Sequence, residues 1–161
     1  MNKLNFALQM EIDGEQYYLK QAELNKNNAM AQVFQILAKA ESTHAELIRR
    51  LSGDFAYGFK DDLLPAEPEN LFSGLGDFKR DAAYLPGQLE VYRLALDMEQ
   101  KSIDLYQGML AETTEESPKK LLAFLIKQEQ DHFALFDELV TLLSRPKDWV
   151  EAAEFGPRDN Y

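Results

Sequence analysis

The sequence contains no cysteine and only two histidines among its 161 residues. Without cysteine, disulfide bonds, iron–sulfur clusters and thiolate zinc sites are all excluded. No apolar run reaches the length of about eighteen residues that a transmembrane helix needs, so no membrane span is expected. The residues before Glu11 also lack the apolar segment of a secretory signal. We therefore expect a cytoplasmic location, which fits the absence of cysteine.

Positive charge is scarce as well. The chain has 17 lysines and arginines against 28 aspartates and glutamates, which gives a net charge of −11. Nucleic acid and anionic membrane surfaces are disfavoured as partners, because both need a basic face on the protein. The same balance is compatible with attracting cations. A hydrophobic fraction of 45% in a chain of this length predicts one domain with a buried core.

Both histidines belong to one motif, Glu-x-x-His, which occupies residues 41–44 and again residues 129–132. The two copies are 88 positions apart. A second motif, Ala-Leu-x-Met-Glu, ends at Glu11 and at Glu99 and has the same offset. The chain therefore contains an internal repeat, in which a glutamate is followed 30 positions later by a Glu-x-x-His motif.

Apolar residues recur at the spacing of amphipathic helices along most of the chain. The predicted helices cover residues 3–25, 29–51, 86–111 and 117–144. Short polar turns join the first helix to the second and the third to the fourth, so each pair should form an antiparallel hairpin. Gly14 lies inside the first helix, where glycine costs about 1 kcal/mol relative to alanine, and it is expected to mark close packing.

The helix boundaries and the connection between the hairpins are predicted from prolines and composition. Pro86 is expected in the first turn of the third helix, Ser117 and Pro118 should cap and begin the fourth, and Pro146 should end it. Residues 53–86 are a long crossover, in which we expect a short helix near residues 71–84 and aromatic side chains packed on the bundle. The predicted fold is an all-α four-helix bundle over residues 1–145, with residues 146–161 as a tail.

The motif glutamates and histidines fall within the apolar stripes of their helices. A buried, ionised carboxylate without a partner costs on the order of several kcal/mol, and four of them together would repel one another. Two divalent cations would neutralise this charge, and neutral imidazoles would add ligands. The predicted ligands of a two-metal site are Glu11, Glu41, His44, Glu99, Glu129 and His132.

The mixture of oxygen and nitrogen ligands suits iron or manganese, and zinc could bind by affinity alone. Two irons could exchange two electrons at a time with dioxygen or hydrogen peroxide. Tyr18 and Tyr106 follow Glu11 and Glu99 by seven positions and lie on the same helix faces. They are candidates either for hydrogen bonds to ligand carboxylates or for core packing. Each histidine also needs an acceptor for its second nitrogen, and the sequence does not assign one.

These residues resemble the rubrerythrin-like branch of the ferritin superfamily. The resemblance covers residues 1–52 and 86–145 and includes all six predicted ligand positions. It implies a ferritin-like bundle that holds two iron ions, with Glu41 and Glu129 bridging them. It also implies reduction of hydrogen peroxide or oxidation of ferrous iron, because members of the family catalyse these reactions.

The chain departs from the family pattern in three respects. Rubrerythrins usually carry a C-terminal rubredoxin domain, whereas this chain has no cysteine, so we expect a separate protein as electron donor. They also have an extra carboxylate three positions after the third-helix glutamate, where this chain has Ser102, which bears on peroxidase turnover. Bacterioferritins bind haem through a methionine where this chain has Ser42, so no haem is expected.

The leading hypothesis is a di-iron oxidoreductase that reduces hydrogen peroxide or dioxygen with electrons from a donor protein and forms a homodimer. A second hypothesis is iron storage with ferroxidase chemistry, which requires a hollow cage. A third is a bundle that keeps its metal site but acts as a protein-interaction module. A substrate hydroxylase is a weaker fourth hypothesis, since it requires a pocket beside the metals.

Overall fold

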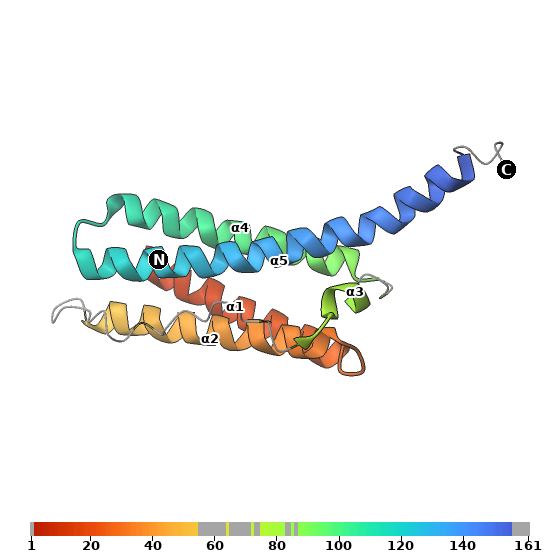
Figure 1. The fold of residues 1–161 in the computed structure, drawn as a ribbon. Coiled ribbons are helices and arrows are strands. Elements are labelled where there is room, and N and C mark those ends of the chain that lie inside the picture. Colours follow the sequence, from red (N-terminus) through yellow and green to blue (C-terminus); the bar gives the residue numbers. More distant parts are fainter. Residues whose placement is uncertain are drawn as a thin grey trace.

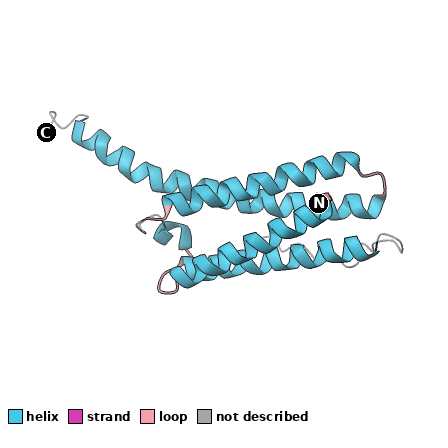
Figure 2. Ribbon diagram, turned by 180° about the vertical axis from the view of Figure 1, so that it is seen from behind, coloured by secondary structure: helices cyan, strands magenta, loops and turns pink. Residues whose placement is uncertain are grey.

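The fold is known from a computed structural model, which describes residues 2–54, 64, 72, 75–82, 85 and 87–155, with only the backbone described for residues 53–54 and 145–155. Its helices are α1 (Lys3–Leu24), α2 (Met30–Asp54), α3 (Phe78–Ala82), α4 (Leu89–Glu112) and α5 (Glu116–Phe155). The four long helices run side by side, with α1 paired to α2 and α4 paired to α5 (Figures 1 and 2). The predicted all-α bundle of two hairpins is confirmed. None of the described helices is both long and apolar enough to cross a bilayer.

Polar side chains fix the turn of the first hairpin. The buried Asn25 ends α1 and donates its side-chain amide to the Gln21 carbonyl at 2.8 Å. Asn28 donates to the Asn25 side chain at 2.9 Å and accepts from the Met30 amide at 2.8 Å. These bonds satisfy backbone groups that the two helix ends leave unpaired, so the chain reverses within a few residues.

Three helix boundaries predicted from prolines differ from those of the structure, and α2 ends at Asp54, three residues later than predicted. Helix α4 begins at Leu89 and is preceded by Gly87 with a positive φ of 73°, while Pro86, expected in its first turn, lies outside the described residues. Helix α5 begins at Glu116, and the Glu115 carbonyl accepts from the Lys119 amide at 3.2 Å. Ser117 is therefore already helical and is not the N-cap. Pro118 still lies in the first turn, where its missing N–H has no helical partner to lose.

The third error concerns the end of α5, which continues past Pro146 to Phe155. A proline inside a helix removes one backbone hydrogen bond and tends to bend the helix, but it does not always stop it. The last part of α5 leaves the line of the bundle in both views (Figures 1 and 2). The predicted boundary at residue 145 therefore does not coincide with a helix end, and a separate role for residues 146–161 stays a prediction.

The core consists of two apolar clusters, one towards each end of the bundle. The first contains stacked rings, with the centroids of Tyr18 and Phe136 5.9 Å apart and those of Tyr18 and Phe34 6.1 Å apart. The second is built around Ile48 and Leu125. Each large apolar side chain that is fully buried contributes about 1.5–3 kcal/mol. On every long helix the predicted ligand residues lie between these clusters in sequence, so the clusters fix their positions.

Part of the crossover packs on the first cluster, as predicted. Phe72 and Phe78 contact it, with their ring centroids 5.8 Å apart, and Lys79 of α3 forms a 2.6 Å ion pair with Glu138 of α5. Helix α3 falls within the predicted range but has only five residues. The remaining aromatic residues expected to pack there lie outside the described residues: Phe55, Tyr57, Phe59 and Tyr84.

Candidate metal centre

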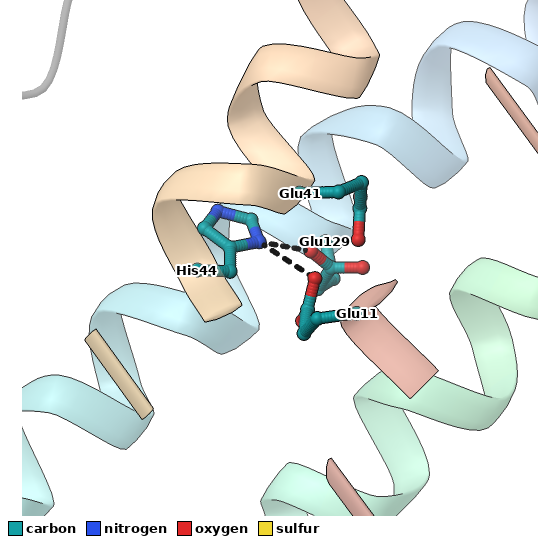
Figure 3. Close-up of side chains that lie close together, drawn as sticks. All are labelled: Glu11, Glu41, His44 and Glu129. Atoms are coloured by element: carbon teal, nitrogen blue, oxygen red, sulfur yellow. Dashed lines mark ion pairs between the residues drawn. The ribbon is translucent and has the colours of Figure 1, made fainter. Parts of the chain in front are cut away.

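The six predicted ligand residues meet inside the bundle. Helices α1 and α4 contribute one glutamate each, and α2 and α5 contribute one glutamate and one histidine each. Every one of the six residues is at most 3% exposed. Figure 3 shows four of them, Glu11, Glu41, His44 and Glu129, turned towards one another from three helices. The 3.6-residue period places Glu and His three positions apart on one helix face, so each motif presents both side chains inward.

The ligand atoms form two overlapping groups, each with atoms within 4.8 Å of one another. The first group is Glu11, Glu41, His44 and Glu129. The second group is Glu41, Glu99, Glu129 and His132. Glu41 and Glu129 belong to both groups, and the other residues belong to one. Two cation positions that share two carboxylates would produce this pattern.

The two histidines present the same nitrogen to the cluster. Nδ1 of His44 lies 2.8 Å from Glu129 Oε1 and 3.4 Å from Glu11 Oε2 (Figure 3). Nδ1 of His132 lies 3.3 Å from Glu41 Oε1 and 3.4 Å from Glu99 Oε1. Each histidine therefore faces carboxylates from two other helices, and the contacts join the two hairpins.

Unpaired buried atoms indicate what the site can hold. Among the described residues, both histidine Nδ1 atoms and at least one oxygen of every cluster glutamate are buried without a hydrogen-bond partner. Buried polar atoms in proteins are normally paired, so such a concentration needs an explanation. Carboxylate oxygens and imidazole nitrogens are ligands for first-row transition metals. The orphaned atoms are all potential metal donors, and the residues present fit a metal centre.

Tyr18 and Tyr106 make reciprocal contacts across the two hairpins. The hydroxyl of Tyr18 on α1 donates to Glu99 Oε1 on α4 at 2.5 Å, and the hydroxyl of Tyr106 on α4 donates to Glu11 on α1. Burial, followed by the negative charge of the carboxylates, raises the pKa of both phenols well above the usual value, so both stay protonated donors. Each tyrosine thus orients one glutamate, while a role in the reaction itself stays a prediction.

Gln128 is a residue that sequence reasoning missed. Its Oε1 lies 2.5 Å from Nε2 of His44, which leaves Nδ1 of that ring free to face the cluster. The repeat gave no signal for it, because the position 88 residues earlier is Ala40. In the part of the chain that the structure describes, Nε2 of His132 has no hydrogen-bond partner. Asp131, the neighbour of His132 in sequence, pairs with Lys127 on the surface at 2.6 Å.

The comparison with family models agrees with this geometry. A model described as Rubrerythrin matches residues 2–140. The chain belongs to the rubrerythrin family. The resemblance inferred from the six motif residues is confirmed, together with the ferritin-like fold, and the buried Glu/His cluster is compatible with a di-iron site. No curated protein and no solved structure matches the chain significantly.

The four rubrerythrin glutamates of the cluster differ in their acidity. Burial, followed by repulsion from neighbouring carboxylates, raises the pKa of Glu41 and of Glu129 well above the usual range. Burial also acts to raise the pKa of Glu11 and Glu99, but attraction to His44 and His132 respectively, with added hydrogen bonds, lowers both. Without metal, Glu41 and Glu129 are therefore weaker acids than Glu11 and Glu99.

Metal uptake at neutral pH is expected to release protons and to strengthen as pH rises. The raised pKa of Glu41 and Glu129 keeps them protonated where a free carboxyl group is ionised, and a metal can bind only after these protons leave. Burial acts to lower the pKa of His44, but attraction to Glu11, hydrogen bonds to Glu11 and Gln128, and attraction to Glu99 together raise it, and this acts in the same direction. Calorimetric titration in buffers of different ionisation heat measures the protons released. Proton-neutral binding with a flat pH profile would contradict the prediction.

Gln128→Ala is expected to weaken the metal position that contains His44 and to spare the one that contains His132. Loss of a hydrogen bond that orients a metal-bound histidine typically lowers metal affinity roughly 10–100-fold. Stepwise metal titration followed by calorimetry would show one of two affinities reduced. Asp131→Ala is the matched control, because Asp131 lies on the same helix and is exposed. Equal weakening of both steps, or of neither, would contradict the assignment.

Proposed function

We propose that the protein is a non-haem di-iron oxidoreductase that reduces hydrogen peroxide or dioxygen with electrons from a separate donor protein. The observation that carries the proposal is the pair of four-residue groups that share Glu41 and Glu129. In this arrangement Glu41 and Glu129 would be the ligands that the two metal positions share. Glu11 with His44 would complete one position, and Glu99 with His132 the other. Family membership supports a redox role for this centre.

When bound, two irons supply two electrons to an oxidant without an organic cofactor. The chain's own residues set the conditions for this chemistry. The phenols of Tyr18 and Tyr106 orient the two outer glutamates, and Gln128 fixes the ring of His44. The apolar clusters close the bundle towards both of its ends, on either side of the buried carboxylates. The proposal assigns the supply of electrons to a separate donor protein, because a rubredoxin-type iron site needs cysteine ligands and the sequence has no cysteine.

The test is rapid mixing of the ferrous protein with hydrogen peroxide and, separately, with oxygen. We expect the reduced centre to be oxidised on mixing with at least one of the two oxidants, with two electrons removed per chain. The oxidation is followed by absorbance and by Mössbauer spectroscopy of the iron. A protein that binds two irons but reacts with neither oxidant would refute the proposed activity.

The same preparation separates the alternative functions. Metal analysis of protein purified without added iron tests the interaction module, which needs no metal. Light scattering tests storage, because storage requires a large hollow assembly, whereas the proposed oxidoreductase is expected as a homodimer. A cage-sized particle that accumulates ferric iron would favour storage over the proposal.

A further inference from the structure

A cavity of about 200 Å³ lies beside the candidate metal centre. Its inner wall is formed by three of the cluster carboxylates, those of Glu41, Glu99 and Glu129. Its outer part is lined by Asp13 of α1 and Lys101 of α4, both exposed. The cavity therefore connects the surface between α1 and α4 with the carboxylates that would hold the metals.

Two small residues create the inner part of this cavity. Gly14 and Ser102 are buried, line the cavity and occupy equivalent positions of the internal repeat. A Cβ atom at position 14 would lie 3.2 Å from Glu41 Oε2, so even a methyl group there would press on a cluster carboxylate. A larger side chain at either position would extend into the space next to the centre.

The flanks of the cavity are apolar and its outer end carries no excess of positive charge. Met10 and Met98, another equivalent pair of the repeat, are half-buried on either side, and their thioethers offer flexible apolar contacts. Asp13 and Lys101 carry one charge of each sign, and Lys101 also pairs with Asp97 at 3.0 Å, so the outer end has no excess positive charge that would attract an anion. These features favour a neutral molecule with an apolar body over an ion.

The volume exceeds what hydrogen peroxide requires. A single water needs about 10–15 Å³ of such space, and an apolar cavity of about 150 Å³ holds a benzene molecule. We propose that the cavity binds the organic group of an alkyl or aryl hydroperoxide and directs its peroxide group to the carboxylate wall. The inference rests on the proposed function and names its substrate class.

The reaction is a two-electron reduction. The O–O bond of the hydroperoxide breaks, two electrons from the donor protein and two protons are taken up, and one alcohol and one water are released. The alcohol keeps the organic group, so it should occupy the same cavity as the substrate. This property allows binding to be measured without turnover.

Binding is tested with cumyl alcohol, the product from cumene hydroperoxide, on the full-length protein labelled with carbon-13 at its methionine methyl groups. The zinc-loaded form is used because zinc is diamagnetic. We expect saturable shifts of the Met10 and Met98 signals, whereas Met30 and Met109, buried in the two apolar clusters, serve as internal controls. The absence of shifts at Met10 and Met98, or equal shifts at all four, would overturn the proposal.

Specificity is tested with Ser102→Leu, which fills the inner cavity, and with Gln107→Leu as control, because Gln107 is exposed on the same helix. In Ser102→Leu we expect kcat/KM for cumene hydroperoxide to fall at least about tenfold more than kcat/KM for hydrogen peroxide. Gln107→Leu should leave the ratio unchanged. An equal fall for both oxidants in folded Ser102→Leu would overturn the proposal. If that variant does not fold, the methionine shifts in the wild-type protein decide.

Failure of this inference is distinguishable from failure of the proposed function. If the wild-type centre reduces hydrogen peroxide but cumyl alcohol does not shift Met10 or Met98, only the substrate class is wrong. If neither oxidant reacts, the proposed function is wrong. The titration with cumyl alcohol can still be run on the metal-free chain, and it then shows independently whether the cavity binds an organic molecule.

Discussion

Glu41→Ala is expected to abolish the binding of two metals per chain. Glu41 belongs to both ligand groups, so its loss removes a donor from both metal positions at once. Helix content should change little, because the two apolar clusters remain and one of four mutually repelling carboxylates is gone. Metal analysis after dialysis gives the stoichiometry, and far-ultraviolet circular dichroism gives the helix content. His132→Ala should also abolish the binding of two metals, because it removes a ligand from the second group.

Glu46→Ala is the matched control for Glu41→Ala. Glu46 lies on the same helix but its side chain is 53% exposed, where it pairs with Arg49 and Arg50. Such exposed ion pairs contribute little to stability, so the control should keep both its metals and its fold. If Glu41→Ala still binds two metals per chain, the bridging assignment is wrong.

Gly14→Leu is expected to cause a similarly large loss of metal binding without removing any ligand. The first atom of the new side chain would already lie 3.2 Å from Glu41 Oε2, and the rest must push the carboxylate away from its present position. Metal titration should show that the second metal binds more weakly or does not bind at all. Thermal unfolding of the metal-free protein would separate this effect from a general loss of packing.

Gly108→Leu provides the comparison for Gly14→Leu. Gly108 is also helical, and nothing lies within 4 Å of a Cβ atom built there. Replacing glycine inside a helix removes an intrinsic cost of about 1 kcal/mol relative to alanine, so the control should be as stable as the wild type or more stable. Gly14→Leu protein that binds two metals with wild-type affinity would show that the carboxylate can move freely.

The parts of the structure that follow from periodic patterns were predictable from the sequence. The apolar stripes defined both hairpins, and the repeat placed Glu11 and Glu99 in register with the two Glu-x-x-His motifs. Burial of all six side chains follows from their positions within those stripes. The close packing predicted for Gly14 is also confirmed, with Glu41 as the neighbour.

Features that depend on contacts between helices could not be predicted in the same way. Gln128 has no counterpart in the repeat, and its role depends on the geometry between α5 and the ring of His44. The cavity results from the sizes of side chains on two helices that are distant in sequence. The helix ends near Pro86 and Pro146 were mispredicted, because proline is compatible with several positions relative to a helix and the surrounding chain decides among them.

The internal repeat has a consequence for how such a centre can change over time. Each hairpin carries three of the six ligands, so substitutions that affect one half alter a centre that both halves share. The two copies still agree at the ligands and at the tyrosines that orient them. They have diverged at Gln128 against Ala40 and at Ser102 against Gly14, which gives the two metal positions different surroundings. The two metal positions, although built from matching ligands, are therefore expected to differ in affinity.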